Sequence, residues 1–391
     1  MSSKTVSRPL LVVCLSTLLL SCSHPTQTVA APPAAPPDVF ADSAPHSREA
    51  NDAGRFLAGL PGTEGSAFTE LEQQEAWSVH RRELDKAWSG IESKTLPAMQ
   101  QFGAKELSAP AIVKSPVFYP FSGPDALMIT VFFPQNSVYL MVALEPPGTL
   151  PTAKHFAHKD LGKQLASVRE TLYDELHRSF FITRQMDRQF RGQVTDGLLP
   201  PILLLLVRSG HTIQGYRFVQ IDHTGKIIQR GTGASTEVGN KGVQVDFVSD
   251  ADGSAHKLYY FSTNLADDRL KKNAGFLAFL SGLKCVTTYF KATSYMTHKP
   301  EFSEIRDQVL AKSVAVLQDD SGIPYKYFDA QPWQVELFGD YERPYGSFRW
   351  LEQKDLRKAY IANAKPLNFQ IGYGFRKVPS NLLFAKKADM K

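Results

Sequence analysis

The longest apolar run after the N-terminus of this 391-residue chain is short, and its length limits what the chain can fold into. The run, Leu198–Val207, contains two prolines. A helix needs about 20 apolar residues to cross a membrane, so the run predicts a buried core helix. Hydrophobic residues at 43% and charged residues at 21% are typical of a globular protein.

The first 22 residues carry the most specific motif in the sequence. Lys4 and Arg8 precede an apolar segment, Leu10–Leu20, which leads into Leu19-Leu20-Ser21-Cys22. This pattern resembles the signal peptide and lipobox of bacterial lipoproteins. The resemblance implies that residues 1–21 are removed and that Cys22 carries the lipid, with membrane lipid as a partner.

The residue after the cysteine bears on the destination of the chain. Because Ser23 rather than Asp follows Cys22, the sorting rule of the lipoproteins implies an anchor in the outer membrane. The expected location is therefore the cell envelope, facing the periplasm or the surface. An ordinary secretory signal cleaved nearby is the alternative.

Residues 22–50 are expected to form a Pro/Ala-rich tether, because Ala-Ala-Pro-Pro-Ala-Ala-Pro-Pro at 30–37 cannot form a helix. Cys14 lies in the signal and Cys22 carries lipid, so only Cys285 remains in the body. The mature chain can therefore form no internal disulfide.

The spacing of apolar residues predicts an α+β fold of several antiparallel hairpins packed with helices. Thr69-Glu-Leu-Glu72 fits a capping box for a helix whose stripe holds Trp77, Leu84, Trp88 and Ile91. His80 shares that stripe and is interpreted as a satisfied, partly buried histidine. Other helices are expected near 161–176, 198–207, 265–280, 301–317 and 354–364, hairpins at 127–144, 215–230 and 243–262, and strands at 333–338 and 367–373.

Two stretches follow one order of hairpin, helix, aromatic pair, helix and Ser-Gly turn. Phe180-Phe181 stand in this order ahead of Ser209-Gly210, and Tyr289-Phe290 ahead of Ser321-Gly322. The order indicates two duplicated α+β units, residues 51–230 with an N-terminal helix and residues 231–391. Chance recurrence of such orders in α+β proteins is the alternative.

The region from Tyr289 to Phe328 concentrates aromatic, His, Asp, Gly and Pro residues. Tyr295 and His298 have i, i+3 spacing, which places them together on a helix, and Asp319 and Asp320 lie on the loop after the next expected helix. A histidine beside a carboxylate and a phenol can do general acid–base chemistry. The same loop could instead fix a chain reversal.

No cofactor, metal or nucleic-acid partner is predicted. The loop 231–239 lacks the third glycine of a dinucleotide motif. His155-Phe-Ala-His158 has no nearby carboxylate at a metal-binding spacing. The net charge of +5 is mild, and no basic block interleaves with aromatics.

These features favour a lipid-anchored envelope protein that acts as a binding or assembly module for an envelope protein or glycan. Aromatic residues at Trp333, Tyr341, Tyr345 and Trp350 offer a contact surface. The alternative is an envelope hydrolase or carbohydrate-active enzyme that uses Tyr295, His298, Asp319 and Asp320.

Overall fold

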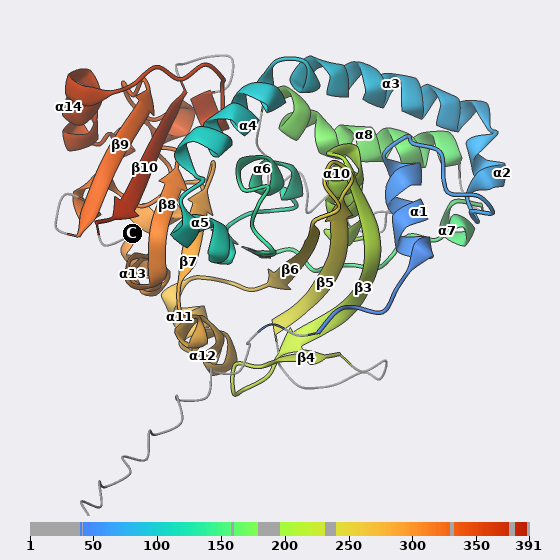
Figure 1. The fold of residues 1–391 in the computed structure, drawn as a ribbon, viewed down its shortest axis with the longest axis horizontal. Helices are drawn as coiled ribbons and strands as arrows, with labels where there is room; N and C mark the ends of the chain where they lie inside the picture. The colour runs from blue at the N-terminus through green and yellow to red at the C-terminus, as the bar shows by residue number, and fades with distance from the viewer. Residues whose placement is uncertain are drawn as a thin grey trace, which may run out of the picture. The chain divides into compact units, whose positions relative to one another are not determined.

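A mixed sheet of ten strands with helices on both faces forms the body of the protein in a computed structural model (Figure 1). The structure describes residues 40, 42–157, 160–178, 196–230, 240–328, 332–374 and 380–388. Residues 39–391 form one compact unit, and only this unit is described here. The predicted α+β class is confirmed.

The strands follow the order β4-β3-β5-β6-β2-β1-β7-β8-β10-β9 across the sheet. The five central strands, from β6 to β8, are parallel, and the flanking strands pair antiparallel. In chain order the strands are β1 Val117–Pro120, β2 Val138–Ala143, β3 His211–Ile221, β4 Ile227–Gln229, β5 Asn240–Ser249, β6 Ala255–Ser262, β7 Val286–Phe290, β8 Ser313–Gln318, β9 Trp333–Gly339 and β10 Asn381–Lys387.

The connections leave the two middle strands, β1 and β7, in opposite directions. From β1 the chain crosses one face of the sheet through α6 (Ala126–Phe132) to β2. From β7 it crosses the other face through α13 (Ser303–Lys312) to β8. Parallel crossovers are right-handed, so a reversal of direction requires a change of face. The gap between β1 and β7 is therefore a topological switch point.

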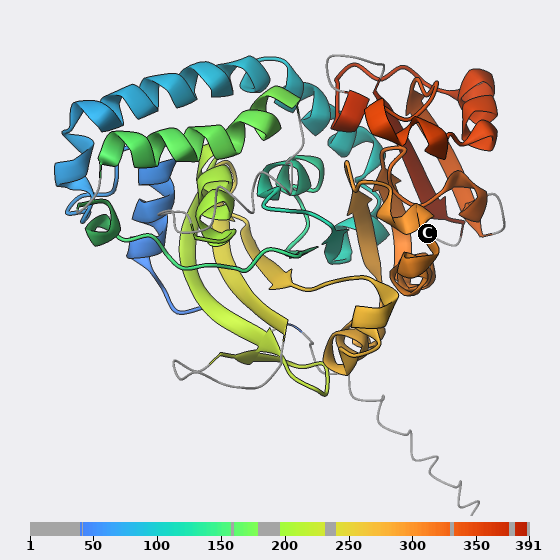
Figure 2. The same ribbon diagram turned by 180° about the vertical axis from the view of Figure 1, so that it is seen from behind.

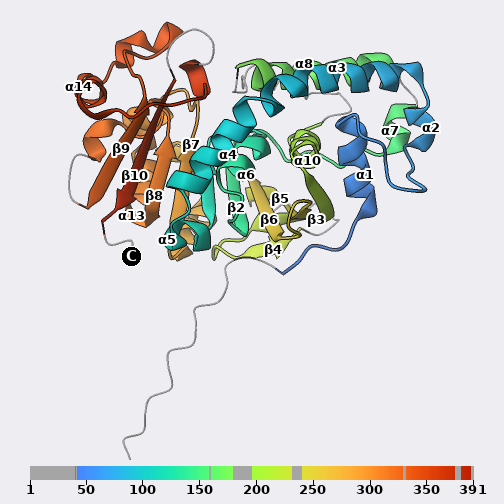
Figure 3. The same ribbon diagram turned by 45° about the horizontal axis from the view of Figure 1, so that its top comes forward.

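The first face of the sheet carries most of the helices. Around α10 (Leu199–Arg208), whose residues 199–207 are all buried, pack α1 (Arg48–Leu57), α3 (Glu75–Glu92) and α8 (Leu161–Arg178), while α4 (Thr95–Glu106) packs on α6 and α3. Figures 1 and 3 show α3 and α8 running side by side. Shorter helices complete this layer: α2 Thr69–Glu72, α5 Pro110–Lys114 and α7 Ala153–Ala157.

The second face is covered by α13 with α11 (Asp267–Leu270), α12 (Ala274–Gly282) and α14 (Lys354–Asn363). Figure 2 shows the same fold from behind. Over β3 and β5 the cover is residues 42–47. There the side chain of Gln244 donates to the Asp42 carbonyl, and Asp246 accepts from the Ala44 N–H at 2.7 Å. Phe40 packs on Tyr259. The last residues of the expected tether are therefore docked on the sheet.

Most elements lie where the sequence predicts them. The stripe on α3, including His80, is buried, and α8, α10, α12 and α14 coincide with expected helices. The hairpins β3–β4 and β5–β6 and the strands β2 and β9 are also confirmed.

The prediction that the first arm of the 127–144 hairpin is a strand was wrong. Residues 126–132 form helix α6 instead, and every one of them is buried. A short, fully apolar run gives no periodicity that separates a buried strand from a buried helix. Asp125 decides the local structure, because its carboxylate accepts from the Met128 N–H and caps the helix.

Three further expectations near helix ends and in the C-terminal region were wrong. The expected 301–317 helix ends at Lys312, and residues 313–318 form β8. Residues 367–373 form no strand, whereas residues 381–387, for which the sequence predicts no element, form β10 between β8 and β9. Pairing on both sides overrides the weak local pattern of a basic tail. Thr69 begins α2 without a side-chain cap, so the capping box is absent.

The stretches expected as two duplicated units share one sheet. Strand β6 of the second stretch pairs with β2 of the first, and β1 pairs with β7. The helix α10 leads into the antiparallel strand β3, whereas α13 leads into the parallel strand β8. Phe180 and Phe181 lie outside the described residues.

In the described part of the chain, no helix has the length and apolarity needed to cross a membrane.

His80 ties α3 to two neighbouring helices. Its Nε2 lies 2.8 Å from the Leu57 carbonyl of α1, and its Nδ1 lies 3.1 Å from the Arg169 guanidinium of α8. The side chain is fully buried. Burial lowers its pKa to about 4, against the opposing effect of the Leu57 carbonyl.

The contribution of His80 to the free energy of unfolding should fall as the pH drops from 6.5 towards 4. In that window the unfolded chain binds a proton at His80 that the folded chain does not, which is worth at most about 3 kcal/mol. Urea titrations at several pH values measure this slope. His80→Gln should change it by the His80 share, with the share of His298, whose pKa burial also lowers to about 4, remaining. His223→Gln, at an exposed turn, should leave the slope unchanged. An unchanged slope in His80→Gln would contradict the assignment.

Candidate functional site

The carboxyl ends of β1, β7 and β8 bring three loops together: residues 121–125, 291–298 and 319–322. Open sheets with parallel strands bind ligands outside the carboxyl ends of the strands, at a topological switch point. We therefore place the candidate site at this carboxyl edge, between β1 and β7.

A buried ion pair joins the first two loops. The Lys291 Nζ lies 2.6 Å from an Asp125 oxygen, and the two side chains are 2% and 1% exposed. The Tyr119 hydroxyl donates to the same oxygen at 2.9 Å. Buried charges are costly unless they are paired and hydrogen-bonded, so this contact fixes the two loops relative to each other.

The same loops contain an unusual backbone conformation. Phe121, Ala292, Ser294 and Tyr295 have φ values of 60°, 52°, 54° and 55°, and in the described part of the chain they are the only non-glycine residues with positive φ. Such residues cost of order 1–3 kcal/mol each, persist only when surrounding structure holds them, and cluster at ligand clamps and switches. All four flank the switch point.

Hydrogen bonds to the loop after β8 hold the loop after β7 in this conformation. The Ala292 N–H donates to Asp319 Oδ2 at 2.9 Å, and the Thr293 N–H donates to Ser321 Oγ at 2.8 Å. On the other side, the Ser294 N–H donates to the Tyr373 hydroxyl at 3.1 Å. These hydrogen bonds from both sides hold the strained residues in their conformation.

The predicted aspartates lie at the centre of this contact. Asp319 Oδ1 accepts from the N–H and hydroxyl of Ser321. Asp320 accepts from the Tyr295 hydroxyl at 2.5 Å and from the Asn381 amide at 3.0 Å. Gly372 packs so closely that a Cβ there would come within 2.3 Å of Asp319 Oδ2. Protein groups therefore engage both carboxyls fully.

Burial changes the titration of this pair. It raises the pKa of Asp320 against the hydrogen bonds from Tyr295 and Asn381. Burial, followed by the charge of Asp320, raises the pKa of Asp319 to about 7, although Ser321 and the Ala292 N–H favour the ionised form. Two adjacent carboxyls in a low-dielectric site cannot both ionise cheaply.

His298 completes the predicted cluster. It lies on the 3₁₀ turn Met296–His298, and its ring meets the Tyr295 ring edge to face at 5.0 Å between centroids. Burial lowers its pKa to about 4, so the ring is neutral. Its Nε2 is buried and has no hydrogen-bond partner among the described residues.

The structure thus brings together Tyr295, His298, Asp319 and Asp320, but through a strained turn rather than an α-helix. Sequence reasoning missed Lys291 and Asp125, which only the adjacency of β1 and β7 reveals. The sequence offers one local signal for Asp125. It follows Gly123-Pro124 and precedes an apolar run, which is a position typical of a helix cap.

Aromatic rings cover the cluster from outside. Phe348, on the 3₁₀ segment Gly346–Leu351, contacts Tyr295 and Tyr373 at 4.9 and 5.4 Å between centroids. On the same segment Trp350 is 74% exposed. Tyr341, expected on a surface, is buried because its hydroxyl accepts from the Gln353 N–H inside the core. Trp333 and Tyr345 are half-buried.

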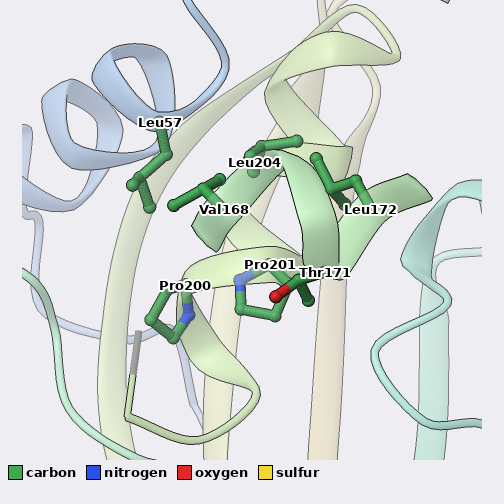
Figure 4. A pocket seen from close by; sticks show the side chains of 7 residues that line it. All are labelled: Leu57, Val168, Thr171, Leu172, Pro200, Pro201 and Leu204. Carbon is green, nitrogen blue, oxygen red and sulfur yellow. The ribbon is translucent and has the colours of Figure 1, made fainter. Parts of the chain in front are cut away.

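Other candidate sites have weaker support. Figure 4 shows a small pocket between α1, α8 and α10 whose lining is apolar apart from Thr171, and the Thr171 hydroxyl donates within its own helix. His155 accepts from the Thr152 N–H, and His158 lies outside the described residues. Within the described ranges no group of three or more His, Cys, Asp or Glu residues is placed to hold a metal.

No protein-family model matches the chain, and neither the curated proteins nor the solved structures contain a significant match to it.

Lys291→Met should lower the free energy of unfolding by about 3–5 kcal/mol, because it leaves the Asp125 carboxylate buried without its cation. Urea denaturation measures the change. Lys163→Met is the matched control: Lys163 forms an exposed pair with Asp160, and its loss should cost at most about 1 kcal/mol. Equal effects of the two substitutions would show that the buried pair does not hold the loops.

Proposed function

We propose that this chain is a lipid-anchored protein of the cell envelope that binds a partner protein through a recognition surface, residues 345–350, beside the carboxyl edge. The observation that carries the proposal is the exposure of Trp350 on a segment fixed to the buried cluster. A glycan partner is the other outcome of the test.

The geometry of the aspartates favours binding over chemistry. A general acid or base must exchange a proton with the substrate and must come within hydrogen-bond reach of it. Asp319 and Asp320 are only 2% and 8% exposed, and each already accepts hydrogen bonds from several protein donors. In this arrangement their oxygens stabilise loops.

The recognition surface has the character of a protein-binding hot spot. A 3₁₀ segment has three residues per turn, so Phe348 faces the cluster while Trp350, two residues later, faces solvent. Trp, Tyr and Arg dominate binding energy at interfaces, and Arg349 beside Trp350 is exposed too. A rigid anchor lowers the entropy lost on binding.

The lipid anchor is supported by the motif at Leu19–Cys22. Cys22→Ser should abolish incorporation of radiolabelled palmitate and move the protein out of the membrane fraction, because no sulfur remains to carry the lipid. Cys14→Ser, within the signal segment, should leave both unchanged. Palmitate labelling of the Cys22→Ser protein would remove the basis of the anchor.

The recognition surface is tested by native mass spectrometry of the full-length lipoprotein extracted from its own membranes. A partner protein should co-purify, and Trp350→Ala should reduce its occupancy at least tenfold, because hot-spot truncations cost about 2 kcal/mol or more. Tyr173→Ala, which removes a 51%-exposed aromatic on α8, should leave the occupancy unchanged. An equal loss in both variants, or in neither, would contradict the proposal.

An envelope hydrolase is the second candidate, and two observations favour it. His298 Nε2 has no hydrogen-bond partner among the described residues. Ser294 sits at positive φ in the loop after the parallel strand β7, four residues beyond its end, with its Oγ 3.1 Å from the Tyr373 hydroxyl; a nucleophilic serine in α/β-hydrolases also lies on a strained turn after a strand. Fluorophosphonate labelling that is lost in Ser294→Ala would favour this candidate over binding.

A further inference from the structure

The two adjacent aspartates hold two of the four non-glycine residues with positive φ in the described part of the chain. Asp319 accepts from the N–H of Ala292, and Asp320 accepts from the hydroxyl of Tyr295. Both of these partners have positive φ. The hydrogen bonds therefore oppose a backbone tendency to leave this conformation.

The tyrosines packed around the pair carry no charge that could balance the charge of the carboxylates. Tyrosines face it from four elements: Tyr295 after β7, Tyr341 after β9, Tyr360 on α14 and Tyr373 near β10. Burial raises the pKa of each of these phenols, so all four are neutral.

The other charged groups nearby are engaged elsewhere. Lys291 pairs with Asp125. Arg306 donates to the Thr297 carbonyl and lies over the Tyr327 ring. Lys326, which faces His298, lies over the same ring, and Asp340 faces Tyr360. His298 itself is neutral.

A second negative charge in this setting is unfavourable. Like charges held close together in a low-dielectric site ionise in two separated steps, and the proton that remains belongs to the pair rather than to one residue. Ionisation strengthens each single hydrogen bond to Ala292 or Tyr295, because a charged acceptor binds a donor more tightly. It also leaves two adjacent carboxylates buried together, and this larger cost is relieved when the loop opens and water reaches them.

We propose that Asp319 and Asp320 form a pH-sensitive latch, which keeps loop 291–298 closed while the pair holds one proton and releases it when both carboxyls are ionised. The closed loop is thus stable in acid, and this stability is lost as the pH rises through neutrality. The sign agrees with the raised pKa of Asp319, about 7, in the folded state. The latch does not depend on the binding function proposed above.

Hydrogen–deuterium exchange on the full-length lipoprotein in detergent tests the latch. Peptides covering residues 286–298 are followed between pH 5 and 9, with rates corrected for the pH dependence of intrinsic exchange. Protection of the amides of Ala292, Thr293 and Ser294 should fall at least tenfold across neutral pH. Peptides from α10 should keep their protection throughout. Wild-type protection that does not change with pH, or that falls equally in α10, would overturn the latch.

A charge-removing variant adds a second test. Asp320→Asn removes one charge and keeps an oxygen for the Tyr295 hydroxyl, so its loop should stay protected at all these pH values. Asp52→Asn is the matched control, because Asp52 is also buried and accepts from Thr63, in a different part of the fold. It should retain the wild-type pH response. A wild-type response in folded Asp320→Asn overturns the proposal, and if that variant does not fold, the wild-type profile decides.

Discussion

The pairing of β1 with β7 is the contact on which the rest of the sheet depends. Six strands lie on one side of it and four on the other, yet the register joins only Val117 with Thr287 and Phe118 with Thr288. Side chains reinforce the pairing at both ends. The Ser115 and Thr287 hydroxyls meet at 2.7 Å below it, and Lys291 pairs with Asp125 above it. Removal of one partner from a buried ion pair leaves an unpaired buried charge and strongly destabilises the fold. The Lys291–Asp125 pair therefore stabilises the contact between β1 and β7.

The strained loop grows out of that contact. Lys291 is fixed by its partner on the β1 side, and Ala292 is held one residue later by Asp319 on the β8 side. Asp320 is itself held by Asn381 at the start of β10. Segments from three regions of the sequence therefore set one backbone conformation, which explains how residues other than glycine can keep positive φ values there.

This construction connects the buried cluster with an exposed aromatic residue. Buried polar networks rigidify a site when every member is satisfied, and here the network supports Tyr295, on which Phe348 rests. The exposed Trp350 is presented by the segment that Phe348 anchors. The same network contains two adjacent buried carboxyls, so in the proposed latch its rigidity depends on their protonation.

The sequence by itself determined the elements with strong periodicity, such as the α3 stripe and the hairpins β3–β4 and β5–β6, and it singled out Tyr295, His298, Asp319 and Asp320. Local pattern carries that information, because amphipathic spacing repeats within one element. Only the tertiary structure decided that residues 381–387 form a strand and that Lys291 meets Asp125. Each of these depends on partners far away in the sequence, whose pairing energy exceeds the local preference and leaves no local trace.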